Sequence, residues 1–153
     1  MADSSRFTAG LEPTLAVVSS LASRLRDDWW IIGSAAIALT GIAIEVPEVE
    51  LLLSERDAGA LLAGWAQPRP ATEGQDRFRS IHGEHTATPI PIEIMGGLEV
   101  CTGGTWVPVT PGTRDRIELA GGAVYIPDAA DQLALLLMFR RTRDLVRAEM
   151  LVR

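Results

Sequence analysis

Two glutamates, Glu48 and Glu50, stand two residues apart inside an apolar segment, residues 46–53. Side chains alternate between the two faces of a β-strand, so both carboxylates are expected on one face, with Val49 and Leu51 on the other. Adjacent carboxylates repel each other unless a positive group lies between them, and a hard cation such as Mg²⁺ takes oxygen ligands. The pair therefore predicts a metal site. The alternative is an edge strand whose solvated acids discourage pairing with another chain.

A turn precedes this strand and offers a second kind of chemistry. An apolar segment, residues 29–32, stops at Gly33 and Ser34, and the Ala-rich and Leu-rich residues 35–40 predict a short helix. Backbone N–H groups at the start of a helix favour anions, so Gly33 and Ser34 are candidates to contact phosphate. The alternative is that Ser34 is an ordinary helix N-cap after a strand.

A third acid, Glu93, lies among apolar neighbours in a predicted strand, residues 90–95. A charge inside a strand is unfavourable without a partner. Glu93 could be a third metal ligand, or a general base that deprotonates an acceptor hydroxyl. It could equally be a surface acid on a half-exposed strand.

The order of these features resembles the nucleotidyltransferase superfamily of the DNA polymerase β type. An apolar strand ends at Gly33-Ser34, a short helix follows, and the next strand carries Glu48-x-Glu50. The small bacterial minimal and toxin–antitoxin-type transferases are the most similar members. The resemblance implies that the Gly-Ser turn holds nucleotide phosphates, that the paired acids bind the metal, and that Glu93 is the third carboxylate. The family normally has aspartates at the paired positions.

The C-terminal part of the chain extends this resemblance. Asp128 is expected to cap one long helix that reaches about residue 152, apolar on all sides in its first half. Residues 141–144, Arg-Thr-Arg-Asp, match a basic motif of the family on this helix. The resemblance covers roughly residues 12–147. Arg141 and Arg143 could pair with phosphates or with an acidic acceptor. The alternative is that these arginines are solvated or paired with the acid that follows them.

The remaining pattern predicts an α/β (α+β) domain over residues 11–153, after a flexible N-terminus of residues 1–10. It favours a nucleotidyltransferase-type mixed, mainly antiparallel sheet with helices packed on it. Ser54 is expected to cap a helix with Asp57 completing a Ser-x-x-Asp box. Helices are expected at 11–26 and 55–65, with a loop at 67–75. Strands are expected at 77–82 and 90–95, joined by a turn at 83–89, and the second strand is expected to end at Gly96-Gly97. Residues 98–109 are strand-rich, and residues 117–119 and 124–126 are expected to form a hairpin.

Composition narrows the class of protein. The net charge of −6 disfavours DNA binding and weakly disfavours RNA, because neutralising phosphates requires a basic surface. No apolar segment reaches the roughly 18 residues that span a membrane. The N-terminus lacks a signal-peptide pattern and Cys101 is the single cysteine, so a cytoplasmic location is expected. The absence of lysine excludes Schiff-base chemistry and a P-loop lysine.

Two functions follow from these observations. The first is a transferase that uses Mg²⁺ and a nucleoside triphosphate, with an acceptor that is a small molecule, a protein or RNA. The second is a degenerate relative that keeps the fold as a binding or assembly module, for example in a two-component system. The oligomeric state stays open, a homo-oligomer included. His82 and His85, in the sequence His-Gly-Glu-His, suggest either a metal site made of two histidines and one glutamate or a surface turn.

Overall fold

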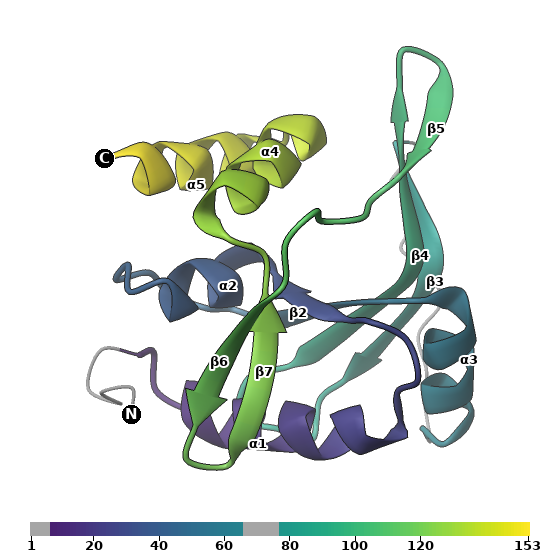
Figure 1. The fold of residues 1–153 in the computed structure, drawn as a ribbon, viewed down its shortest axis with the longest axis vertical. Coiled ribbons are helices and arrows are strands. Elements are labelled where there is room, and N and C mark those ends of the chain that lie inside the picture. Colours follow the sequence, from purple (N-terminus) through teal and green to yellow (C-terminus); the bar gives the residue numbers. More distant parts are fainter. Residues whose placement is uncertain (1–6, 66–76) are drawn as a thin grey trace.

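The computed structural model describes residues 7–65 and 77–153 (Figure 1). The expected loop at 67–75 and the first residues of the expected flexible N-terminus lie outside the described residues. The elements in chain order are α1 (Leu11–Leu21), a 3-10 turn (Ala22–Arg24), β1 (Trp30–Ile32), α2 (Gly33–Leu39), β2 (Val49–Leu53), α3 (Glu55–Ala63), β3 (Phe78–His85), β4 (Ile92–Thr102), β5 (Thr105–Pro108), β6 (Asp115–Leu119), β7 (Gly122–Ile126), α4 (Ala129–Phe139) and α5 (Thr142–Val152).

The main sheet has the strand order β1-β2-β4-β3, and β5 pairs with β4. Strands β2 and β4 run parallel, while the other pairs are antiparallel. The predicted mixed, mainly antiparallel sheet is therefore confirmed. Strand β2 lies between β1 and β4, so the edge-strand alternative for Glu48 and Glu50 is wrong. The strand is also shorter than expected, because it begins at Val49 and leaves Glu48 just before it.

The two faces of the sheet pack against different helices. Val49 and Leu51 of β2 belong to a buried cluster with α1, α3 and the β6–β7 hairpin. Leu52 belongs to a second cluster, with Leu135 and Phe139 of α4. Figure 1 shows α1 on one side of the sheet and α4 on the other. Burial of each such aliphatic side chain stabilises the fold by about 1.5–3 kcal/mol. Because side chains alternate along β2, Glu50 lies on the same face as Leu52, the face that carries α4.

Strand β4 continues through the glycine pair that was expected to end it. Glu99 pairs with Arg79, but Gly96 pairs with Ile81, so β4 holds one extra residue at this point. Gly97 has φ 61° and occupies the left-handed region that a glycine bulge requires. The bulge reverses the alternation of the strand. Ile94 therefore packs on the α1 side, whereas Leu98 packs on the α4 side.

Strand β3 likewise continues to His85, so the turn expected to begin at Gly83 is wrong. A Cβ at Gly83 would overlap the side chain of Leu62 on α3. The helix therefore approaches the strand closely here, and a larger side chain would require Leu62 to move. The predicted hairpin is confirmed, with Ile117 opposite Val124.

The helices differ from expectation mainly at their ends. The C-terminal helix is two helices, because Arg140 adopts a left-handed conformation (φ 60°) between α4 and α5. Leu137 is 50% exposed, so α4 is not buried on all sides. Ser54 and Asp128 cap their helices as predicted. Asp57 does not complete a capping box, because its carboxylate accepts backbone N–H groups of the 3-10 turn region instead. Two expected helices are shorter, ending at Leu21 and Ala63.

Candidate active site

Strand register brings the predicted acids together. Ile32 of β1 lies opposite Glu50 of β2, and Glu50 lies opposite Glu93 of β4. Glu48 is the residue immediately before β2. One carboxylate oxygen from each of Glu48, Glu50 and Glu93 lies within 4.8 Å of the others. One acid from β2, one from β4 and one from the residue just before β2 thus meet on the face of the sheet that carries α4.

The environment gives the three carboxyl groups different proton affinities. Burial and the charge of Glu93 raise the pKa of Glu50 to about 7, and Glu50 is 6% exposed. Burial and the hydrogen bond with Glu93 raise the pKa of Glu48 to about 7. Burial acts to raise the pKa of Glu93 as well, but hydrogen bonds from His82 and Glu48 outweigh it and lower that pKa. Glu48 is therefore protonated more readily than Glu93, and Glu93 is ionised more readily than Glu48.

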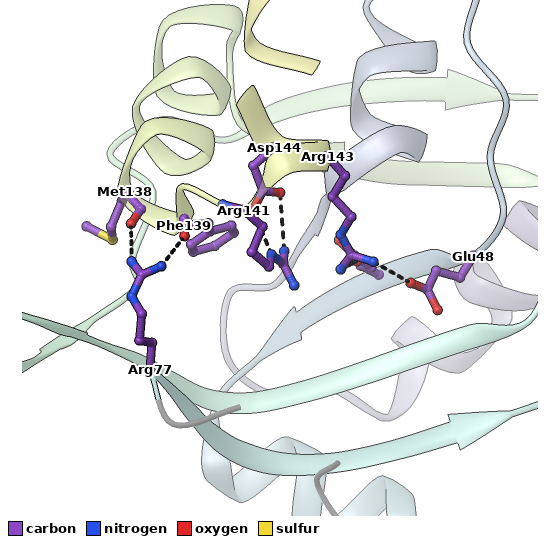
Figure 2. Close-up of polar contacts among 8 residues, drawn as sticks. Glu48, Arg77, Met138, Phe139, Arg141, Arg143 and Asp144 are labelled. Carbon is purple, nitrogen blue, oxygen red and sulfur yellow. Dashed lines mark hydrogen bonds and ion pairs between the residues drawn. The ribbon is translucent and has the colours of Figure 1, made fainter. Parts of the chain in front are cut away.

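Arg143 of α5 is the arginine that faces the acids. Its Nη2 atom lies 3.7 Å from Glu50 Oε1 and its Nη1 atom lies 3.9 Å from Glu48 Oε1. Figure 2 shows this guanidinium reaching down from α5 toward Glu48. Arg147, one turn later, is half-buried; burial lowers its pKa, and the charge of Glu50 acts in the opposite direction. Arg143 and Arg147 of α5 thus place positive charge near the acids.

Arg141 is held differently from Arg143. Its Nε atom donates to Asp144 Oδ2 at 2.7 Å (Figure 2). Its guanidinium lies over the rings of Phe78 and Phe139. The ion-paired alternative therefore describes Arg141 correctly, although its side chain also lines the cavity described below. Arg77 holds the same corner in place, because it donates to the Met138 and Phe139 carbonyls that end α4.

The Gly33-Ser34 turn lies directly against the acids. Gly33 has φ 73°, and a Cβ built there would overlap Glu50 Oε2. Only glycine allows the chain to turn from β1 into α2 so close to this carboxylate. Ser34 is buried within α2, whose N-cap is Ile32. The alternative interpretation of Ser34 as an N-cap is therefore wrong.

His82 is a residue of the site that sequence analysis missed. Its Nε2 atom lies 2.9 Å from Glu93 Oε1. His85 stacks on Trp65 instead, with ring centroids 5.1 Å apart. Neither the two-histidine metal site nor the surface turn is found among the described residues. The alternation over residues 78–82 places Phe78 and His82 on the same face of β3. Only the pairing of β3 with β4 shows that this is the face of the acids.

These side chains line one cavity of about 280 Å³. Its charged lining includes Glu48, Glu50, Glu93, His82 and Arg143. Its apolar and aromatic lining is formed by Ile32, Phe78, Met95, Leu98 and Phe139. The cavity can hold a ligand that combines a charged group with a planar or apolar one, because both kinds of surface are available.

Several known protein structures share this overall fold. TM1012 from Thermotoga maritima, a candidate nucleotidyltransferase, superposes with a TM-score of 0.66 at 22% identity over 91% of this chain and 90% of its own. The lincosamide antibiotic adenylyltransferase LnuA, with lincomycin bound, gives 0.60 at 11% identity over 95% and 97%. This chain has the nucleotidyltransferase fold. An antigenic nucleotidyltransferase-like protein from Paracoccidioides brasiliensis gives 0.54 at 13% identity over 95% of this chain and 77% of that protein.

The nucleotidyltransferase fold is thus recognised from structure, as the resemblance predicted. No protein-family model and no curated protein sequence matches the chain. Within the described residues, no helix is both long enough and apolar enough to cross a membrane.

Proposed function

We propose that this protein is a metal-dependent nucleotidyltransferase, which transfers a nucleoside monophosphate from a nucleoside triphosphate to an acceptor hydroxyl. The observation that carries the proposal is the meeting of Glu48, Glu50 and Glu93 beside the Gly33 turn. The similarity to an adenylyltransferase supports the same class of reaction.

The donor set fits a hard divalent cation. Three carboxylate oxygens within 4.8 Å of one another match the oxygen ligands that Mg²⁺ and Mn²⁺ take. The raised pKa values of Glu48 and Glu50 also fit, because a cation would stabilise both ionised carboxylates where they now repel each other. Glu48, Glu50 and Glu93 would hold the metal. When bound, it would neutralise charge on the phosphates of the nucleotide.

The residues of the chain supply the rest of the chemistry. Glu93, ionised and hydrogen-bonded to His82, accepts the proton of the acceptor hydroxyl. The acceptor oxygen forms a bond to the α-phosphorus, and the bond from that phosphorus to the pyrophosphate oxygen breaks. Backbone N–H groups of Gly33 and Ser34 contact phosphate oxygens. Arg143 provides further positive charge next to them, and Arg141 lines the same cavity.

Ligand-dependent stability tests the proposal. A ligand that binds the native state raises the melting temperature, so at least one of ATP, GTP, CTP or UTP should raise it together with Mg²⁺ or Mn²⁺. Glu50→Gln should abolish the metal-dependent part of that shift. Glu118→Gln on β6 is the control, because this glutamate is exposed and pairs with Arg116. A shift that is unchanged in Glu50→Gln would contradict the site. Transfer of α-³²P label to an acceptor would then identify the product.

One observation favours a second function, a binding or assembly module without catalysis. The guanidinium of Arg143 already supplies positive charge to Glu48 and Glu50, at 3.9 and 3.7 Å. In such a module this arginine would replace the metal permanently. The module predicts no melting-temperature shift with any nucleotide and metal, and a loss of stability in Arg143→Gln. The transferase predicts a shift with at least one combination.

A further inference from the structure

His82 reaches Glu93 across two neighbouring strands. In the β3–β4 ladder His82 lies opposite Met95, and Glu84 lies opposite Glu93, so the imidazole contacts the acid diagonally. The distance from His82 Nε2 to Glu93 Oε1 is 2.9 Å. The two side chains are only 13% and 20% exposed. A hydrogen bond in this setting is protected from competing water and is directional.

We propose that His82 is a positioning residue, whose N–H group holds the Glu93 carboxylate toward Glu48 and Glu50. This inference rests on the proposed function, because it assigns His82 a role in the affinity for the divalent cation. Histidines and other donors behind a metal-binding carboxylate fix its orientation, and removing them typically weakens metal binding by about 10–100-fold.

The charges around Glu93 explain why it needs such support. One carboxylate oxygen of Glu48 and one of Glu50 lie within 4.8 Å of an oxygen of Glu93. When these acids are ionised they repel Glu93 and favour rotamers that turn it into the cavity. The side chain of glutamate has three rotatable bonds, so the backbone of β4 does not by itself prevent this rotation. The hydrogen bond from His82 opposes it.

His85 provides a matched comparison within the same strand. It is three residues from His82, an odd number, so the two imidazoles project from opposite faces of β3. His85 packs on Trp65, which follows α3, and does not line the cavity. A role in metal affinity should therefore belong to His82 alone.

Binding of Mn²⁺, followed by electron paramagnetic resonance, tests the proposal without measuring activity. The variants are His82→Leu, which has no donor, and His82→Gln, which keeps an N–H donor in a side chain of similar length. His82→Leu should weaken Mn²⁺ binding about tenfold or more, His82→Gln should recover most of that loss, and His85→Leu should bind like the unsubstituted protein. His82→Ala is the second donor-free variant if His82→Leu does not fold.

The outcomes separate this inference from the proposed function. Equal affinity for Mn²⁺ in His82→Leu and the unsubstituted protein would overturn the role of His82 and leave the metal site intact. Equal weakening in His82→Leu and His82→Gln would also overturn it, because the N–H donor would then be irrelevant. Failure of the unsubstituted protein to bind Mn²⁺ would overturn both.

Discussion

Two acids of this protein, Asp57 and Glu50, are almost equally buried but are stabilised in opposite ways. Asp57, at the start of α3, is 2% exposed, and Glu50, in the central strand, is 6% exposed. The Asp57 carboxylate accepts the backbone N–H groups of Arg26 at 3.1 Å and Asp27 at 2.8 Å. Glu50 instead lies against Glu93, and Arg143 is 3.7 Å away.

Under the proposed function, one buried charge stabilises the fold and the other is kept for a ligand. Backbone donors around Asp57 are fixed by the chain itself, so this carboxylate links α3 to the segment before β1. The surroundings of Glu50 do not stabilise its negative charge in this way, because burial and the charge of Glu93 both disfavour its ionised form. In the proposed transferase, a bound divalent cation would offset this cost. The predictions below test this contrast between Asp57 and Glu50.

The largest effect is expected from Glu50→Gln. We expect affinity for Mn²⁺ to fall roughly a hundredfold, since a ligand is at least as important as the residues behind it. The free energy of unfolding without metal should stay the same or rise, because a buried charge among like charges is removed. Calorimetric titration with Mn²⁺ and urea denaturation measure the two quantities. Undiminished Mn²⁺ affinity would remove Glu50 from the site.

Asp57→Asn should show the opposite pattern. We expect the free energy of unfolding to fall by roughly 1.5–3 kcal/mol, because hydrogen bonds to a charged acceptor are replaced and a backbone N–H loses its partner. Affinity for Mn²⁺ should not change. The same urea and titration experiments apply. A variant as stable as the unsubstituted protein would show that Asp57 is not the link between α3 and the preceding segment.

Gly33→Ala and Gly41→Ala separate backbone strain from the position of Glu50. Both glycines have positive φ, 73° and 103°, so each substitution should cost about 1–3 kcal/mol of stability. A Cβ at Gly33 would also overlap Glu50 Oε2, whereas nothing lies within 4 Å of one at Gly41. Only Gly33→Ala should therefore weaken Mn²⁺ binding as well. Equal Mn²⁺ affinity in the two variants would contradict the contact between the turn and the acid.

A smaller effect is expected from pH. The pKa of Glu48 and of Glu50 is about 7 in the metal-free protein, above the ordinary value of 4.5. Between these values the native state binds more protons than the unfolded state, so metal-free stability should fall as pH rises from about 4.5 to 7. Stabilisation by Mn²⁺ should grow over the same range, because the acids must lose their protons to bind it. Thermal melts with and without Mn²⁺ test both signs. Parallel curves would contradict the role of these acids.

Much of the site could be predicted because its signals are local. The two-residue spacing of Glu48 and Glu50 fixes their common face, and Asp128 caps a helix through groups three residues away. The turn at Gly33 could also be predicted from the residues next to it. These features depend on the backbone within a few residues, which the sequence determines directly.

The features that were missed depend on contacts between distant segments. In the sequence, Gly83 is typical of a turn. Its contact with Leu62 of α3 exists only in the folded protein, where Gly83 lies within a strand. Gly97 forms a bulge within β4, and only pairing with β3 distinguishes that bulge from the end of a strand. His82 was assigned to the wrong environment for the same reason. The break at Arg140 is stabilised by Arg77, which is remote in sequence and donates to the last carbonyls of α4.

Anomalous diffraction from a crystal soaked in Mn²⁺ tests the central claim most directly. The account predicts an anomalous peak bounded by the carboxylates of Glu48, Glu50 and Glu93, with Arg143 turned away from them. A soak that leaves Arg143 against Glu48 and Glu50, with no peak between the three acids, would contradict it.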